Sequence, residues 1–166
     1  MEINEITGEI IDASIKIHKR LGPGLRESVY EEVLHYELTK RGLLSERQVP
    51  LPVIYDEIKM DIGFRVDLLV EKKVIVELKS VETVTPFFKK KVLNHLRLTN
   101  LQIGLLINFN VELLKNGITR LLITMQNKKE YKIAFIESLQ LSSLFELSIE
   151  YRKQQVNMVQ QTPQGP

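Results

Sequence analysis

Apolar side chains recur at helical spacing through the first forty residues, in two separate runs. The first run, mainly isoleucines, predicts an amphipathic helix over residues 3–20. Gly22-Pro23-Gly24 ends this helix, because proline lacks a backbone donor and glycine accepts positive φ. A second helix is predicted over residues 25–40, with Gly24 as its N-cap and Gly42 as its C-terminal stop. Its apolar stripe consists of Tyr30, Val33, Leu34 and Leu38.

Two polar side chains fall on the apolar faces of these helices. His18 widens the apolar face of the first helix, which favours a partly buried packing histidine over a ligand. Glu27 lies one turn before Tyr30, so the stripe would carry it inward, where a carboxylate is costly unless something pairs with it. Alternatively, Glu27 points to water and favours the positive end of the helix dipole. Its position alone does not decide between the two.

A series of short apolar runs then predicts a sheet. Pro50 and Pro52 interrupt the first run, which indicates an edge strand or an irregular one. Gly63 separates the second run from the third. The last two runs are apolar on both faces, which predicts a sheet covered by helices on both sides. The four predicted strands are residues 48–55, 58–62, 64–70 and 74–80.

The remaining chain predicts one more helix and further strands. Thr85-Pro86 opens the helix, with proline at an early position, and it runs to about residue 98. The Gln-rich residues 152–166 cannot bury enough apolar surface to order, so a single domain is expected over residues 1–151. The other predicted elements are strands at 101–108, 119–125 and 131–136, a helical turn around 111–114, and a weak helix at 139–151.

Composition narrows the function classes only a little. With 166 residues, 43% hydrophobic and 27% charged, the chain fits one globular domain. A formal net charge of +2 permits a nucleic-acid partner without arguing for one. The absence of cysteine excludes disulfides, a thiol nucleophile and a thiolate metal site. No apolar run approaches the roughly 20 residues of a membrane span, and the acidic start lacks a signal peptide's pattern, so a cytoplasmic protein is expected.

The hairpin over residues 67–79 carries three charged residues in apolar strands: Asp67, Glu77 and Lys79. Glu77 and Lys79 share one face because strand side chains alternate. A two-residue loop at Lys72-Lys73 would send the two carboxylates to opposite faces. A three-residue loop, Glu71-Lys72-Lys73, would place Asp67 directly opposite Glu77. A metal site therefore requires an odd-numbered loop or a bulge.

The residue types suit a divalent metal. Mg²⁺ prefers hard oxygen ligands, so two carboxylates, a carbonyl and a substrate phosphate suffice. Such an ion acidifies a bound water and stabilises charge on a phosphoryl group. A lysine two residues after the second carboxylate can orient the water or neutralise developing charge. The hairpin alone also allows a structural salt-bridge network of Asp67, Glu77 and Lys79, and on this pattern alone that simpler interpretation is favoured.

Several motifs in order resemble a known family. Gly24-Leu-Arg-Glu27-Ser-Val-Tyr30 matches the motif that names the GxxExxY protein family, a branch of the PD-(D/E)XK nuclease superfamily. The predicted order helix, strand, strand, strand, helix, strand is also the core order of that superfamily. The resemblance covers roughly residues 6–125. Further matching words are Leu21-Gly-Pro-Gly, Glu46-Arg-Gln-Val-Pro-Leu-Pro, Phe64-Arg-Val-Asp67-Leu-Leu-Val, Val76-Glu77-Leu-Lys79 and Leu105-Leu-Ile-Asn-Phe-Asn110.

The resemblance implies an α/β (α+β) fold with a central mixed sheet flanked by helices, an N-terminal helix and a C-terminal extension. It also implies that Asp67 and Glu77 bind Mg²⁺ or Mn²⁺ and that Lys79 is the catalytic lysine. Glu27 would be the helix carboxylate that many members place at the same metal centre. Tyr30 is expected to pack under the site rather than to act in it.

One departure concerns the helix that follows the lysine. RecB-type nucleases carry a glutamine there, followed four residues later by a tyrosine, whereas this chain has Lys91 and His95. Lys91 can reach a phosphate as a point charge, and His95 lies one turn further along the same face. Lys89, Lys90 and Lys91 could track a nucleic-acid backbone, or they could form a solvated helix face.

Two functions are therefore in view. One is a Mg²⁺-dependent nuclease that hydrolyses phosphodiester bonds in DNA, without a membrane role. The other is a nuclease fold retained as a nucleic-acid- or protein-binding module, which the modest net charge and the altered Lys91 and His95 favour. A homodimer is compatible with either function. No phosphate-binding glycine loop or serine nucleophile elbow points to another enzyme class.

Overall fold

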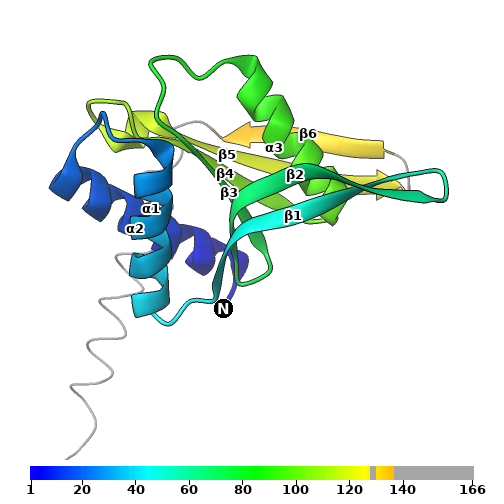
Figure 1. Cartoon of the computed structure of the whole chain (residues 1–166), viewed down its shortest axis with the longest axis horizontal. Coiled ribbons are helices and arrows are strands. Elements are labelled where there is room, and N and C mark those ends of the chain that lie inside the picture. The colour runs from blue at the N-terminus through cyan, green and yellow to red at the C-terminus, as the bar shows by residue number, and fades with distance from the viewer. Residues whose placement is uncertain (128–129, 137–166) are drawn as a thin grey trace, which may run out of the picture.

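The computed structural model describes residues 1–127 and 130–136, and these form one mixed sheet with helices on both faces (Figure 1). The strand order is β1-β2-β3-β4-β5-β6, with β3 and β4 parallel and every other neighbouring pair antiparallel. The predicted fold class is therefore confirmed. The elements are α1 (Ile3–Leu21), α2 (Glu27–Lys40), β1 (Ser45–Tyr55), β2 (Ile58–Val70), β3 (Val74–Lys79), α3 (Pro86–Thr99), β4 (Ile103–Asn108), the 3₁₀ turn η1 (Leu114–Gly117), β5 (Ile118–Asn127) and β6 (Glu130–Ile136).

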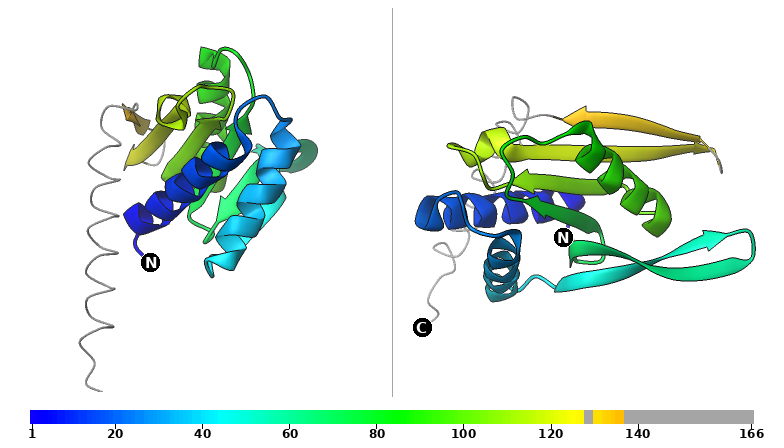
Figure 2. Two further views of the ribbon diagram at one scale, coloured as in Figure 1. Left: turned by 90° about the vertical axis from the view of Figure 1, so that its left-hand side faces the viewer. Right: turned by 45° about the horizontal axis from the view of Figure 1, so that its top comes forward.

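The central strands β3 and β4 are buried along their whole length, as continuous apolar runs predict. Val76 and Leu78 belong to a large core shared with α1 and α2, whereas Ile75 belongs to a smaller core under α3. Figure 2 shows the same arrangement from two further sides, with α1 and α2 on one face of the sheet and α3 on the other. The sheet is covered on both faces, as predicted.

The β1–β2 hairpin differs in part from its prediction. The two strands predicted over 58–62 and 64–70 are one continuous strand, because Gly63 takes a φ of +78° without interrupting the pairing. β1 lies at the edge of the sheet, as its prolines indicated, and the pairing register shifts between Leu51 and Val53. The outer part of this hairpin extends away from the rest of the molecule (Figure 1).

Several boundaries also differ from their predictions. Helix α2 begins at Glu27 with Arg26 as its N-cap, so the predicted N-cap at Gly24 is wrong. Gly24 instead takes a φ of +93° in the loop before the helix. The predicted helical turn at 111–114 lies later, at Leu114–Gly117. The predicted helix at 139–151 and tail at 152–166 lie outside the described residues. Within the described ranges, no helix combines the length and hydropathy that a bilayer span requires.

Candidate functional site

The loop between β2 and β3 decides which side chains face each other. Val70 pairs with Val74, and the register continues through Leu68 opposite Val76. The loop therefore contains three residues, with Glu71 and Lys72 both at a φ of +52°, and the predicted odd-numbered loop is confirmed. Extended by one pair, this register places Asp67 opposite Glu77. The two-residue alternative, with the carboxylates on opposite faces, is wrong.

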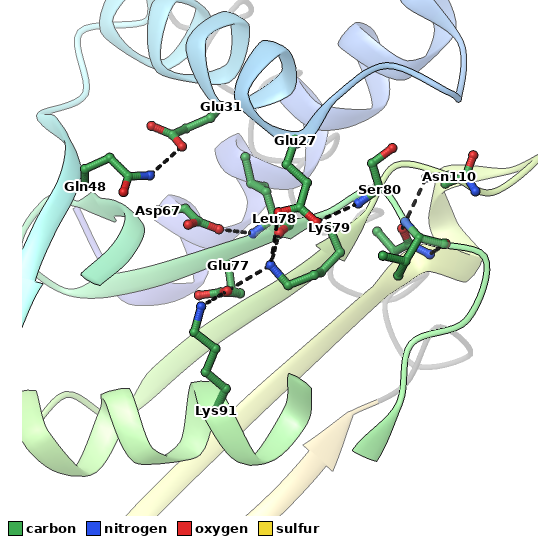
Figure 3. A network of polar contacts seen from close by, with 12 residues as sticks. Glu27, Glu31, Gln48, Asp67, Glu77, Leu78, Lys79, Ser80, Lys91 and Asn110 are labelled. Atoms are coloured by element: carbon green, nitrogen blue, oxygen red, sulfur yellow. Dashed lines mark hydrogen bonds and ion pairs between the residues drawn. The ribbon is translucent and has the colours of Figure 1, made fainter. Parts of the chain in front are cut away.

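Asp67 is tied to the strand that carries Glu77. Its Oδ2 accepts a hydrogen bond of 2.7 Å from the backbone N–H of Leu78 (Figure 3). Gln48 lies on β1, opposite Asp67 on β2, between the Arg47–Leu68 and Val49–Val66 pairs. Its backbone takes a φ of +51°, which is strained for a residue other than glycine, and its side chain donates to Glu31 at 2.6 Å. The prolines at positions 50 and 52 indicated an edge or irregular strand, but not that Gln48 itself would take a positive φ.

Glu77 is the centre of the site, and its side chain has no exposed surface. One oxygen, Oε1, accepts from two ammonium groups, Lys79 at 2.9 Å and Lys91 at 2.5 Å. The Lys79 Nζ also lies 2.5 Å from the carbonyl oxygen of Leu78 and 3.4 Å from Oε2 of Glu27. The Lys79 ammonium thus stands where three oxygens from two different elements converge (Figure 3).

Glu27 both favours the dipole of its helix and points toward the site, so it combines features of the two alternatives considered from the sequence. It is the first residue of α2, where a negative charge favours the helix dipole, and its side chain is 44% exposed. It nevertheless points toward the end of β3, where Oε1 accepts from the backbone N–H of Ser80 at 3.3 Å. Glu27 therefore lies at the rim of the site rather than on the buried face of its helix.

The charges of the cluster shift one another's pKa values. Burial, and then the charge of Glu77, raises the pKa of Asp67 to about 6, against the opposing Leu78 N–H and the two lysines. Burial alone would lower the pKa of Lys79, but the charge of Glu77 and its hydrogen bond outweigh it and raise that pKa. Lys79 is therefore a stable cation at neutral pH, and Asp67 is an acid whose charge is easily neutralised.

The structure separates the residues of α3 that the sequence grouped together. Lys91 reaches Glu77, whereas Lys90 points to solvent, and Lys89 lines a separate pocket of about 310 Å³. His95 is 1% exposed and lies against Glu77 and the ring of Phe64. The predicted contact of His95 with a nucleic acid stays a prediction, and it would require His95 to become exposed. The three lysines do not form one continuous stripe, because successive helical positions point in different directions.

Buried polar groups with no partner mark this cluster. Oε2 of Glu77 and both ring nitrogens of His95 lack a hydrogen bond within the described part of the chain. Burial lowers the pKa of His95, although the charge of Glu77 opposes the shift, so its ring is neutral at pH 7. Most buried polar groups in folded proteins find partners, so exceptions grouped at one point need an explanation.

The supporting residues fix the end of β3. Tyr30 is fully buried, stacks on Phe109 at a centroid distance of 4.2 Å, and donates to the carbonyl of Gly22 at 2.7 Å. It packs under the site, as predicted. The side-chain amide of Asn108 holds the chain that leaves β3, because its Oδ1 accepts from the backbone N–H of Val81 at 3.0 Å and its Nδ2 donates to the carbonyl of Val81 at 2.8 Å. His18 bonds to the carbonyl of Val111 at 2.8 Å, which confirms a packing role.

The comparison with known families agrees with this geometry. The family model described as the PD-(D/E)XK nuclease superfamily matches residues 4–121, well over half of the chain. The chain belongs to the PD-(D/E)XK nuclease superfamily. The matched range includes Glu27, Asp67, Glu77 and Lys79. No curated protein and no solved structure matches the chain significantly. The finer resemblance to the GxxExxY branch stays a prediction.

Members of this superfamily typically use divalent metals, and the donor chemistry here is compatible with one. Among the described side chains, no group of three His, Asp or Glu converges on a single point as a finished metal site. However, hard oxygens of Glu27, Glu77 and Leu78 already surround one cation, the Lys79 ammonium. Oε2 of Glu77 is in addition buried without a partner. The residues therefore fit a hard cation, provided that the lysines give up part of their contact with Glu77.

Proposed function

We propose that this protein is a Mg²⁺-dependent nuclease that hydrolyses phosphodiester bonds in DNA. In this proposal Asp67 and Glu77 hold the metal, Glu27 contributes from the rim, and Lys79 is the catalytic lysine. Superfamily membership supports a nuclease-like function in general. The choice of DNA and of Mg²⁺ goes beyond that membership and rests on the site.

The observation that carries the proposal is the convergence at Lys79. Its ammonium contacts Glu77, the Leu78 carbonyl and Glu27, and Asp67 accepts a hydrogen bond from the backbone N–H of the same residue, Leu78. These residues come from α2, β2 and β3, so only the folded chain brings them together. A purely structural salt bridge would not need carboxylates from both α2 and β3 around one buried lysine, with a third carboxylate from β2 bonded to the neighbouring backbone N–H.

Each side chain has a definable part in the chemistry. Glu77 and Asp67 supply anionic oxygens, and a divalent ion there would add positive charge at a phosphoryl group and acidify a water. Lys79 keeps its proton at neutral pH, so it neutralises negative charge as the phosphorus gains an oxygen. Glu27 is exposed enough to accept a hydrogen bond from the attacking water. The backbone N–H of Leu78 keeps Asp67 aligned with Glu77.

A second function is favoured by a specific observation. Glu77 has no exposed surface and is engaged by two ammonium groups, one of which is Lys91 from α3. This doubly neutralised carboxylate is a weaker metal ligand than one with a free oxygen pair. The alternative is therefore a nuclease fold that binds nucleic acid or protein without cutting.

The test is a cleavage assay on labelled single-stranded and double-stranded DNA with Mg²⁺, Mn²⁺ or EDTA. Wild type is expected to cut both DNA forms only in the presence of metal. Glu77→Gln is expected to lose at least about 100-fold in rate, because it removes an anionic ligand without changing side-chain volume.

Glu37→Gln is the matched control. Glu37 is also buried and bonded to a lysine, but it joins α1 to α2 away from the site. It should cut at the wild-type rate. A wild type that binds DNA but cuts no faster with metal than Glu77→Gln would overturn the nuclease proposal and favour the binding module.

A further inference from the structure

Phe87, the second residue of α3, is 68% exposed, the largest exposed fraction among the aromatic side chains that the structure describes. A single exposed apolar residue is ordinary on a protein surface, so its surroundings decide whether it has a role. Its ring meets the ring of Phe88 edge-on, with 5.9 Å between the centroids. Phe88 packs partly against the core under α3, whereas Phe87 remains in solvent.

The two rings connect the lysine of the candidate site to the surface. The Lys79 Nζ lies over the ring of Phe88, 5.4 Å from its centroid. The two distances limit the separation of the Phe87 ring from the Lys79 Nζ to about 11 Å, which stacked nucleotides, at about 3.4 Å each, span in about three steps. Phe87 therefore lies within reach of a base close to a phosphate at Lys79.

The charge of α3 suits a nucleic-acid strand. The helix contains no acidic residue and four basic ones, Lys89, Lys90, Lys91 and Arg97. Lys91 points into the site (Figure 3), whereas Lys90 is exposed. Residues three apart are neighbours on a helix surface, so Lys90 lies beside Phe87. An exposed ring next to a cation is the combination with which proteins bind single strands.

Another exposed apolar surface has the opposite charge. Ile54, Tyr55 and Ile58, at the end of the β1–β2 hairpin, are each at least 63% exposed, but the turn between them is Asp56-Glu57. Two carboxylates at that turn repel phosphate groups. Both its charge and its distance from Lys79 therefore favour Phe87 over the hairpin as the ring that contacts a nucleic acid.

We propose that Phe87 stacks on a base of single-stranded DNA whose phosphate lies at Lys79. This inference rests on the proposed function for the place of the phosphate, and it narrows the substrate of that site. In a duplex each base is covered by its neighbours, whereas a single strand can turn the face of a base toward the ring. Phenylalanine has no hydrogen-bonding side-chain group, so all four bases should be accepted. Duplex DNA should be cut, but more slowly than a single strand.

Stacking can be observed directly because the chain contains no tryptophan. Phe87→Trp introduces one indole, whose fluorescence should be quenched when a single-stranded oligothymidylate binds to the full chain in EDTA. An abasic oligonucleotide of the same length supplies phosphates without bases, and a duplex keeps its bases stacked, so both should quench much less. Tyr36→Trp is the matched control, since Tyr36 is 60% exposed with Lys40 Nζ 6.0 Å from its ring, but lies on α2. Its fluorescence should not change.

Phe87→Ala measures the contribution of the ring to affinity. Stacking on an aromatic side chain typically accounts for about 5-fold or more in affinity, so this variant should bind oligothymidylate at least about 5-fold more weakly. It should bind the abasic strand as tightly as wild type does. Fluorescence anisotropy with labelled oligonucleotides in EDTA measures both affinities, and Tyr36→Ala should change neither. Circular dichroism matched to wild type shows that the variants are folded.

The outcomes separate this inference from the proposed function. An unquenched Phe87→Trp, together with a Phe87→Ala that binds oligothymidylate like wild type, would overturn the stacking role even where metal-dependent cleavage is observed. Equal quenching by abasic or duplex DNA would also overturn it, since the ring would not contact an unpaired base. Quenching by a single strand in a protein that cuts no DNA would overturn the nuclease proposal alone. Failure to bind any DNA would overturn the inference and favour a protein partner for Phe87.

Discussion

Two buried carboxylates, Glu37 and Glu77, each bind lysine, yet they are built differently. Glu37 accepts from one ammonium, that of Lys16, through both oxygens at 2.9 and 2.8 Å, and that lysine is half exposed. Glu77 offers one oxygen to two ammonium groups and leaves the other without a hydrogen bond. In the first arrangement both carboxylate oxygens have a partner, and the ion pair joins two helices. In the second arrangement one oxygen has two partners and the other has none, which is expected where stability has been given up for binding or catalysis.

The residues around the two carboxylates also differ in how well their charges and hydrogen bonds are paired. The α1–α2 contact adds a second balanced group, in which Arg41 binds Glu9 and Asp12 at 2.8 Å each. Around Glu77 the neighbours are instead Asp67, whose pKa is raised to about 6, and a neutral buried His95. A like-charged acid and an unpaired imidazole do nothing to stabilise Glu77. Substitutions in the two clusters should therefore change the free energy of unfolding, and its dependence on pH, by different amounts.

The largest difference is expected on removing each carboxylate. Glu77→Leu leaves Lys79, whose side chain is 8% exposed, without its main partner, so we expect a loss of about 2–4 kcal/mol in unfolding free energy. Glu37→Leu leaves Lys16, which turns to water, so the loss should be about 1 kcal/mol or less. Urea denaturation measures both. The double variant Glu77→Leu with Lys79→Met should recover most of the loss, and equal losses for the two single variants would remove the contrast.

A smaller difference is expected in how the free energy of unfolding depends on pH, and its sign is opposite in the two clusters. The folded-state pKa of Asp67, about 6, exceeds its ordinary 3.8, so folding is weakened as pH rises from about 4 to 6 and stays weakened above. Asp67→Asn should therefore be more stable than wild type at pH 8 by about 1–2 kcal/mol, after allowance for partial exposure, and equal to it near pH 4.

Glu37 provides the opposite case. The hydrogen bond from Lys16, opposed by burial, lowers the pKa of Glu37 below its ordinary 4.5. Its stabilisation is present above that value and is lost as pH falls below it. Glu37→Gln should thus be less stable than wild type at pH 8 and approach it in acid. Thermal unfolding in EDTA from pH 3 to 8 measures both variants, and shifts of the same sign would contradict the comparison.

The sequence predicted the parts of the fold that depend on local pattern. The periodicity of α1 and the continuous apolar runs of β3 and β4 are local signals, and all three elements lie within two residues of their predicted limits. Gly63 was misleading, because a glycine between two apolar runs suggests a break. Here its φ of +78° is absorbed within the long strand β2.

Only the part of the site that strand pairing determines was predictable from the sequence. Strand alternation, combined with a three-residue loop, predicts Asp67 opposite Glu77, and the observed pairing, which ends one pair earlier at Leu68 and Val76, has the matching register. Which residue of α3 meets Glu77 depends on how that helix packs across the sheet, and no local pattern encodes this. The sequence therefore predicts only that Lys91 and His95 share one face of the helix, and the structure shows that both lie against Glu77.

The smallest effect should come from Lys91, whose side chain is 30% exposed. Lys91→Gln removes one of the two cations that bind Oε1 of Glu77, and water can fill the space that the ammonium leaves. Unfolding free energy should change by less than about 1 kcal/mol, as for other part-exposed ion pairs. Affinity for Mn²⁺ should rise about 3- to 10-fold, because the metal no longer competes with this ammonium for the carboxylate. Calorimetry on the purified variant measures this change.

Lys90→Gln is the matched control, since Lys90 is adjacent on α3 but exposed to solvent. It removes the same charge from the chain and should leave Mn²⁺ affinity within about twofold, because exposed charges are screened by salt. Equal changes in the two variants would mean that net charge alone sets metal affinity. A fall in affinity for Lys91→Gln would mean that Lys91 positions Glu77 for the metal rather than competing with it. In that case the imbalance around Glu77 is part of a preorganised site, and the two lysines support metal binding together.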